Sequence, residues 1–65
     1  MENFQKRLRE ERKRLGLKGA ELACVGGVSG VSQSNYENGK KIPGAGYLAA
    51  IAAAGVDVQY VLTGR

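Results

Sequence analysis

The 65-residue sequence has no histidine, no tryptophan and only one cysteine, Cys24. Histidine is the commonest general base and the commonest metal ligand in proteins, so its absence argues against catalysis. One cysteine cannot form an internal disulfide, and a structural metal site needs several cysteine or histidine ligands. We therefore expect a protein that is not an enzyme, that uses no metal or cofactor, and that is stabilised by helix packing or oligomerisation.

Long apolar runs are also missing. The longest, residues 48–56, is mostly alanine, and it is far shorter than the roughly 20 residues that span a membrane. The N-terminal segment reaches a charged run by Lys6 and has no apolar region typical of a signal peptide. A free thiol without an export signal predicts a cytoplasmic location, and we expect Cys24 to be a small, partly buried apolar residue. The length allows one domain, residues 1–65, and nothing in the sequence indicates a membrane or a small-molecule ligand.

The positive charge is concentrated in the first two thirds of the chain. Nine of the ten lysines and arginines and five of the six acidic residues lie in residues 1–41, so the whole net charge of +4 is found there. A solvated helix with i,i+4 pairs such as Glu10–Arg14 explains this run of charges. A surface that contacts phosphate explains it as well, and the isoelectric point near 9.6 favours that second interpretation modestly.

The pattern of apolar residues, caps and glycines predicts five short helices and no confident strand. The expected ranges are 3–14, 18–25, about 30–37, 45–54 and 58–63. Asn3, Ser29 and Asp57 are candidate N-caps of the first, third and fifth helices. The glycines expected to end helices or form turns are Gly16, Gly27, Gly39, Gly55 and Gly64. The predicted fold class is therefore all-α.

The second and third predicted helices are joined by a short turn at Gly26–Gly27. Two helices joined by a three- to four-residue turn with glycine form a helix-turn-helix, here about residues 18–37. An eight-residue helix is about 12 Å long, and the major groove of B-DNA, about 12 Å wide, admits one helix. The polar outer face of the third helix could approach base edges, with Lys40 and Lys41 holding a phosphate beside it.

A set of residues in a fixed order runs through almost the whole chain. Its members are Arg12, Leu15-Gly16-Leu17, Glu21-Leu22-Ala23, Gly27-Val28-Ser29, Ser34-Asn35-Tyr36-Glu37-Asn38-Gly39-Lys40 and Pro43. This set resembles, without a gap, the Cro/cI-type helix-turn-helix regulators, the xenobiotic-response-element family of phage and bacterial repressors. Residues 55–64 are similar to the fifth helix of that family. The resemblance implies a compact, lambda-repressor-like bundle of five helices.

The resemblance also implies a role for each matching position. The base-reading positions are Ser29, Gly30, Val31, Ser34 and Asn35. Asn38 and Lys40 match positions that contact the DNA backbone. We expect Lys18, Lys41 and the N–H of Gly19 to contact it as well. Asn35 is the best candidate base reader, because an amide can bond N6 and N7 of adenine together. Arg12 and Glu37 would form a partly buried ion pair that fixes the angle between the first and third helices.

The function implied is sequence-specific binding of double-stranded DNA and transcriptional regulation, chiefly repression. One recognition helix reads only about four or five base pairs, so we expect a homodimer on a palindromic operator. By resemblance, residues 56–65 and the loop after Pro43 would form the dimer contacts. Tyr47 and Tyr60 are expected to make core or dimer contacts, and Tyr36 to anchor the third helix in the core.

Three positions depart from the family pattern. Gly19 stands where the family usually has a glutamine that contacts phosphate, and Gly30 stands where a long side chain commonly reads a base. Gln33 occupies a position that is usually isoleucine or valine facing the core. Either Gln33 finds a polar partner, or the third helix is rotated or shifted.

Two alternatives follow from these departures. Residues 27–34 contain the near copies GVSG and VSQS, so a second alignment starts the third helix with residues 31–34 and deletes three residues. We prefer the ungapped alignment, because it keeps both flanking motifs in register. The alternative function is a protein-interaction module or antitoxin of the same fold, with weak or lost DNA specificity.

Overall fold

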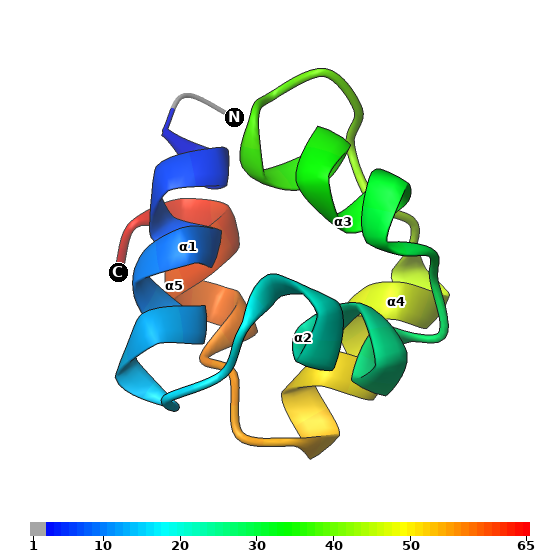
Figure 1. Ribbon diagram of the computed structural model, residues 1–65. Helices are drawn as coiled ribbons and strands as arrows, with labels where there is room; N and C mark the ends of the chain where they lie inside the picture. Colours follow the sequence, from blue (N-terminus) through cyan, green and yellow to red (C-terminus); the bar gives the residue numbers. More distant parts are fainter. Residues whose placement is uncertain (1–2) are drawn as a thin grey trace.

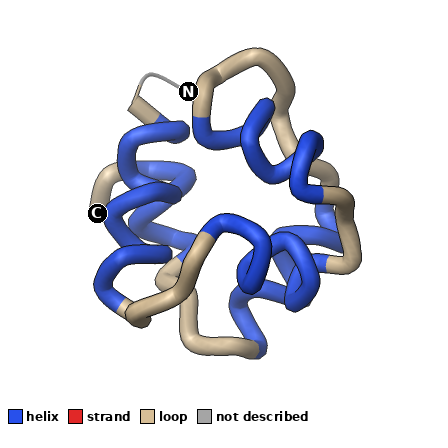
Figure 2. The backbone as a smooth tube through the Cα atoms, viewed as in Figure 1, coloured by secondary structure: helices blue, strands red, loops and turns tan. Residues whose placement is uncertain are grey.

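The computed structural model describes residues 3–65. These residues form five α-helices and no strand (Figures 1 and 2). The helices are α1 (Phe4–Arg14), α2 (Gly19–Gly26), α3 (Gly30–Glu37), α4 (Ala45–Ala53) and α5 (Val58–Thr63). The all-α prediction is confirmed, and every boundary lies within one residue of its predicted position. Within residues 3–65, no helix combines the length and the apolar composition that a membrane span requires.

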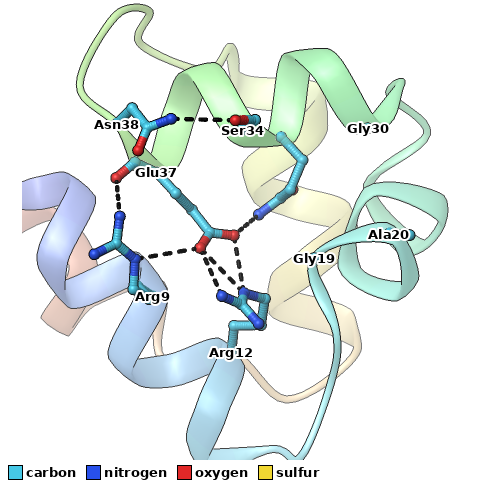
Figure 3. Close-up of a pocket in the computed structure, with 9 residues that line it drawn as sticks. Arg9, Arg12, Gly19, Ala20, Gly30, Ser34, Glu37 and Asn38 are labelled. Carbon is cyan, nitrogen blue, oxygen red and sulfur yellow. Dashed lines mark hydrogen bonds and ion pairs between the residues drawn. The ribbon is translucent and has the colours of Figure 1, made fainter.

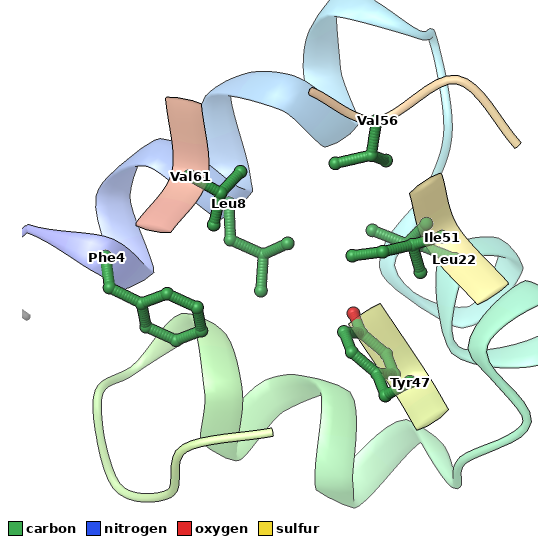
Figure 4. Packing of buried hydrophobic residues seen from close by; sticks show 7 residues of the cluster. All are labelled: Phe4, Leu8, Leu22, Tyr47, Ile51, Val56 and Val61. Atoms are coloured by element: carbon green, nitrogen blue, oxygen red, sulfur yellow. The ribbon is translucent and has the colours of Figure 1, made fainter. Parts of the chain in front are cut away.

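The five helices pack around one core in a bundle that measures 26 × 23 × 20 Å. Helix α1 packs against α3 and α5, and α2 packs against α3 and α4 (Figure 1). The buried apolar side chains of the core cluster come from four helices and one loop (Figure 4): Phe4, Leu8, Leu22, Tyr47, Ile51, Val56 and Val61. Helix α3 contributes no residue to this set, because its buried residues are Gln33 and Glu37.

Two of the three predicted N-caps are confirmed. The Ser29 hydroxyl accepts the N–H of Ser32 at 3.1 Å, and the Asp57 carboxylate accepts the N–H of Tyr60 at 3.0 Å. The prediction for Asn3 is wrong: its φ is 61°, and its side chain makes no cap hydrogen bond. An N-cap side chain normally reaches the first turn from an extended backbone, and Asn3 has a left-handed one.

The predicted ion pair between Glu10 and Arg14 is also wrong. Arg14 instead forms two hydrogen bonds with Glu11, at 2.8 and 2.9 Å. Glu11 lies on the face of α1 that meets the start of α5, where it also accepts the N–H of Asp57 at 2.7 Å. These hydrogen bonds, the one from Arg14 first, hold the pKa of Glu11 below its usual value despite burial. Glu10 accepts the hydroxyl of Tyr60 at 2.6 Å instead, and this bond raises the pKa of Tyr60.

The prediction that Cys24 is partly buried is wrong, because its side chain is exposed. Each residue of a helix is rotated by about 100° from the one before it. Leu22 and Ala23 face the core, so Cys24 lies about 200° from Leu22 and points outward. Tyr47, in contrast, is buried as predicted.

Candidate nucleic-acid interface

Helices α2 and α3 are joined by residues 27–29, which form the turn of a helix-turn-helix. Gly27 has φ +73°, a left-handed conformation that favours glycine, and it ends α2. Ser29 is extended and caps α3, which begins at Gly30. This start agrees with the ungapped alignment. The five glycines that were expected at turns and helix ends are also the glycines with positive φ in residues 3–65.

The start of α2 has only half of a capping box. The Glu21 carboxylate accepts the backbone N–H of Lys18 at 2.7 Å. The Lys18 side chain has no acceptor atom, so it cannot accept a hydrogen bond from a backbone N–H of the first turn. The N–H of Gly19, at the first helical position, has no acceptor within the helix and is available for an external one.

The outer face of α3 carries the candidate base-reading residues. Gly30, Val31 and Ser34 are exposed and Asn35 is half-buried. Positions one, four and five residues beyond Gly30 lie on adjoining parts of one helix surface, so their side chains face the same way. Val31 is 72% exposed, and it could contact a thymine methyl group there.

The candidate backbone-contacting residues flank this face. Lys18 lies before α2, and Lys40 and Lys41 follow α3; all three are exposed. The N–H groups of Lys40 and Lys41 donate to the carbonyl of Asn35 at 2.9 and 3.4 Å, which holds the start of this loop against the end of α3. The exposed Asn38 side chain donates to the Ser34 hydroxyl at 3.1 Å. The sequence did not predict this last contact between a base-reading and a backbone-contacting candidate.

A hollow of about 480 Å³ opens between α1, α2 and α3 (Figure 3). Its lining residues are Arg9, Arg12, Gly19, Ala20, Gly30, Gln33, Ser34, Glu37 and Asn38. A Cβ atom added at Gly19 or at Gly30 would meet nothing within 4 Å. The two glycine departures therefore leave open space on the surface that would face DNA.

The expected ion pair between Arg12 and Glu37 is present below this surface (Figure 3). Arg12 Nε and Nη2 each lie 2.9 Å from a different carboxylate oxygen of Glu37. The Arg12 side chain is 17% exposed and that of Glu37 is 7% exposed, so the pair is largely desolvated. Arg9 adds a hydrogen bond from Nη2 to the Glu37 carbonyl at 2.8 Å. Sequence reasoning missed Arg9, although its place three residues before Arg12 puts it on the same face of α1.

Gln33 finds two polar partners, so the first of the two possibilities for this residue is correct. Its Nε2 donates to Glu37 Oε2 at 2.6 Å, and its Oε1 accepts the hydroxyl of Tyr47 at 2.5 Å. Burial raises the pKa of Tyr47 to about 12, so its hydroxyl stays protonated at neutral pH. The ring of Tyr36 packs edge-on against that of Tyr47, with ring centres 4.9 Å apart. Tyr36 thereby packs against the core from the end of α3, as expected.

The geometry suits binding of a polyanion. Small side chains without charge occupy the outer face of α3, and exposed lysines lie before α2 and after α3. Among the described residues, no group of three or more histidines, cysteines, aspartates or glutamates could hold a metal ion.

Comparison with known proteins gives one match. A family model described as "Helix-turn-helix" matches residues 8–61. The matched range includes the whole of α2, α3 and α4 and parts of α1 and α5. No curated protein and no solved structure matches the chain.

Proposed function

The chain belongs to the Cro/cI-type helix-turn-helix family of DNA-binding transcription regulators, and we propose that it represses transcription by binding a palindromic operator as a homodimer. Helix α3 enters the major groove of each half-site. The observation that carries the proposal is the outer face of α3, where Ser34 and Asn35 stand beside the exposed Val31, with exposed lysines before α2 and after α3. Residues 1–65 act as one DNA-binding domain, and repression follows because the bound dimer blocks the polymerase.

Sequence is read by the side chains on the outer face of α3. Asn35 pairs with adenine through its amide, and Val31 contacts a thymine methyl group. Ser29 and Ser34 donate to or accept from neighbouring base edges. Gly30 lets the backbone approach the bases closely, since no side chain stands there.

The register on DNA is set by contacts to the sugar-phosphate backbone. Lys40 and Lys41 contact phosphates on one side of the groove, and Lys18 contacts them on the other. Asn38 and the N–H of Gly19 add neutral hydrogen bonds to phosphate oxygens.

Dimerisation supplies the remaining specificity, because two half-sites about one helical turn (about 34 Å) apart are read together. Residues 56–65 and the loop after Pro43 form the contact between subunits.

The experiment begins with selection of preferred sequences from a pool of randomised duplexes. Asn35→Ala should lower discrimination between selected and random DNA by about 1–3 kcal/mol, with little effect on random DNA. Lys40→Ala should weaken binding to both and reduce the slope of log K against log [salt] by about one. Lys13→Ala is the matched control, because Lys13 is exposed on α1 and is assigned neither a DNA contact nor a dimer contact.

The two variants have to behave differently for the assignment to stand. Equal losses from Asn35→Ala and Lys40→Ala on both kinds of DNA would contradict the separate roles. The alternative function, a protein-interaction module or antitoxin, is favoured by the missing side chains at Gly19 and Gly30. Equal binding of selected and random duplexes at moderate salt, or no binding, would support that alternative.

A further inference from the structure

Helix α3 is held in the bundle in a different way from the other helices. Each of the other four buries at least one apolar side chain, whereas the buried residues of α3 are Gln33 and Glu37. Gln33 is 2% exposed and Glu37 is 6% exposed. Apolar contacts have little directional preference, but hydrogen bonds weaken steeply when their angle changes. The half-buried ring of Tyr36 also packs α3 against Tyr47, but the directional contacts are those of Gln33 and Glu37. The orientation of α3 is therefore sensitive to the partners of these two side chains.

The hydrogen bonds of Gln33 can form in only one orientation of its amide. A carboxylate only accepts hydrogen bonds, so the Gln33 nitrogen must face Glu37. The Gln33 oxygen then faces Tyr47, whose hydroxyl donates to it. Reversing the amide would place its oxygen against the carboxylate of Glu37.

The two ends of this hydrogen-bonded chain are fixed by other helices. Glu37 is held by Arg12 of α1. The ring of Tyr47 in α4 lies against Gly26 of α2, where an added Cβ would overlap it. Gln33 thus connects α3 to points on α1 and α4 that cannot easily move.

A rotation of α3 about its axis would displace the side chains on its outer face. With side-chain ends about 5–6 Å from the axis, a rotation of about 20° moves them by about 2 Å. A displacement of that size breaks a paired hydrogen bond between an amide and a base. Asn35, two residues after Gln33, would be displaced in this way.

We infer that Gln33 is a positioning residue for DNA specificity, because its bonds to Tyr47 and Glu37 set the rotation of α3 and thereby the alignment of Asn35 with the bases. The inference rests on the proposed function, since it needs a duplex that the wild-type protein prefers. It assigns no contact with DNA to Gln33, which is buried.

The main variant is the double substitution Gln33→Met/Tyr47→Phe. Methionine keeps the unbranched shape of glutamine, and phenylalanine removes the hydroxyl that would otherwise lose its acceptor. Removing both partners together avoids a buried unpaired donor, so the fold should survive. The probes are the duplex selected by the wild-type protein and a random duplex of equal length, at one fixed salt concentration.

The double variant should bind the random duplex as tightly as the wild type does and lose about tenfold in preference for the selected duplex, as for one misplaced base contact. Ile51→Val is the matched control: it loosens the core through a fully buried residue of α4 and leaves the Gln33 hydrogen bonds in place. Its preference for the selected duplex should match that of the wild type.

Two outcomes would overturn the inference. One is a double variant that keeps the wild-type preference, and the other is an equal loss of affinity for both duplexes. If the double variant does not fold, Tyr47→Phe alone provides the test. Its preference for the selected duplex over the random one should fall about threefold, and an unchanged preference would refute the inference. A wild-type protein that selects no preferred duplex would instead contradict the proposed function, and the two failures are therefore distinguishable.

Discussion

Replacing Glu37 by glutamine should destabilise the protein strongly. The substitution keeps the shape of the side chain but removes the charge that neutralises the guanidinium of Arg12. Removing one partner of a buried ion pair costs about 3–5 kcal/mol. Arg12 keeps some hydration, with 17% of its side chain exposed, and keeps its hydrogen bond to the Leu17 carbonyl at 3.0 Å. We therefore expect a loss of about 2–4 kcal/mol, about 1 kcal/mol below the range for a fully buried pair.

That loss is large for a domain of this size. At roughly 0.05–0.15 kcal/mol per residue, the free energy of unfolding of a 65-residue domain is about 3–10 kcal/mol. The assay is urea denaturation followed by far-ultraviolet circular dichroism at pH 7, comparing midpoints and slopes. Arg12→Met and the double variant Arg12→Met/Glu37→Gln complete a double-mutant cycle.

The double-mutant cycle distinguishes a buried ion pair from an exposed one. In the double variant the uncompensated charge is absent, so its loss should be about 2 kcal/mol smaller than the sum of the two single losses. A loss below about 1 kcal/mol for Glu37→Gln, or additive losses, would refute the reasoning, because exposed pairs behave in that way.

Four further predictions concern pH and backbone conformation. Because the pKa of Glu11 is lowered in the folded protein, this residue stabilises the fold above the unfolded pKa of about 4.5, and the stabilisation is lost as the pH falls through the folded pKa. Between pH 7 and pH 3, the Tm of Glu11→Gln should therefore fall less than the Tm of the wild type. An equal fall in the two proteins would contradict this. The pKa of Tyr47 is raised from 10.0 to about 12, so stability should be lost as the pH rises across that window, and urea midpoints of Tyr47→Phe should fall less there. Gly39→Ala should lower the free energy of unfolding by about 1–2 kcal/mol, because φ is +76° and the new Cβ would lie 3.3 Å from Gln5. Gly30→Ala should instead raise it by up to about 1 kcal/mol, since α3 has open space there and alanine favours helix; a destabilised Gly30→Ala protein would contradict the geometry of α3.

Most of the fold could be predicted because its signals are local. Glycines mark the ends of the helices, and Ser29 and Asp57 cap two of them within a few residues of sequence. The errors arise where a local rule depends on a conformation that the sequence does not specify. Asn3 has a suitable side chain for capping but an unsuitable backbone. Arg14 pairs with Glu11 and not with Glu10, because the N–H of Asp57, 46 residues further along the chain, donates to the Glu11 carboxylate and holds it in place.

The candidate site was predictable to a smaller extent. The resemblance led to the Arg12–Glu37 pair, and the helical period placed the outer face of α3. Of the two partners of Gln33, Tyr47 could not be predicted, because it lies 14 residues away on another helix. A buried glutamine requires some partner, but only the packing of α3 against α4 determines which residue supplies it.

The open space above Gly19 and Gly30 has a consequence for how this protein can change over generations. A Cβ atom added at either position meets no neighbour within 4 Å, so a single codon change can introduce a side chain here while the core and the buried hydrogen bonds remain as they are. In the proposed function, a new side chain at position 30 would change which bases are read, and one at position 19 would change the contact with phosphate. The same two positions would serve as randomised sites in a library of regulators that share one scaffold and do not cross-react.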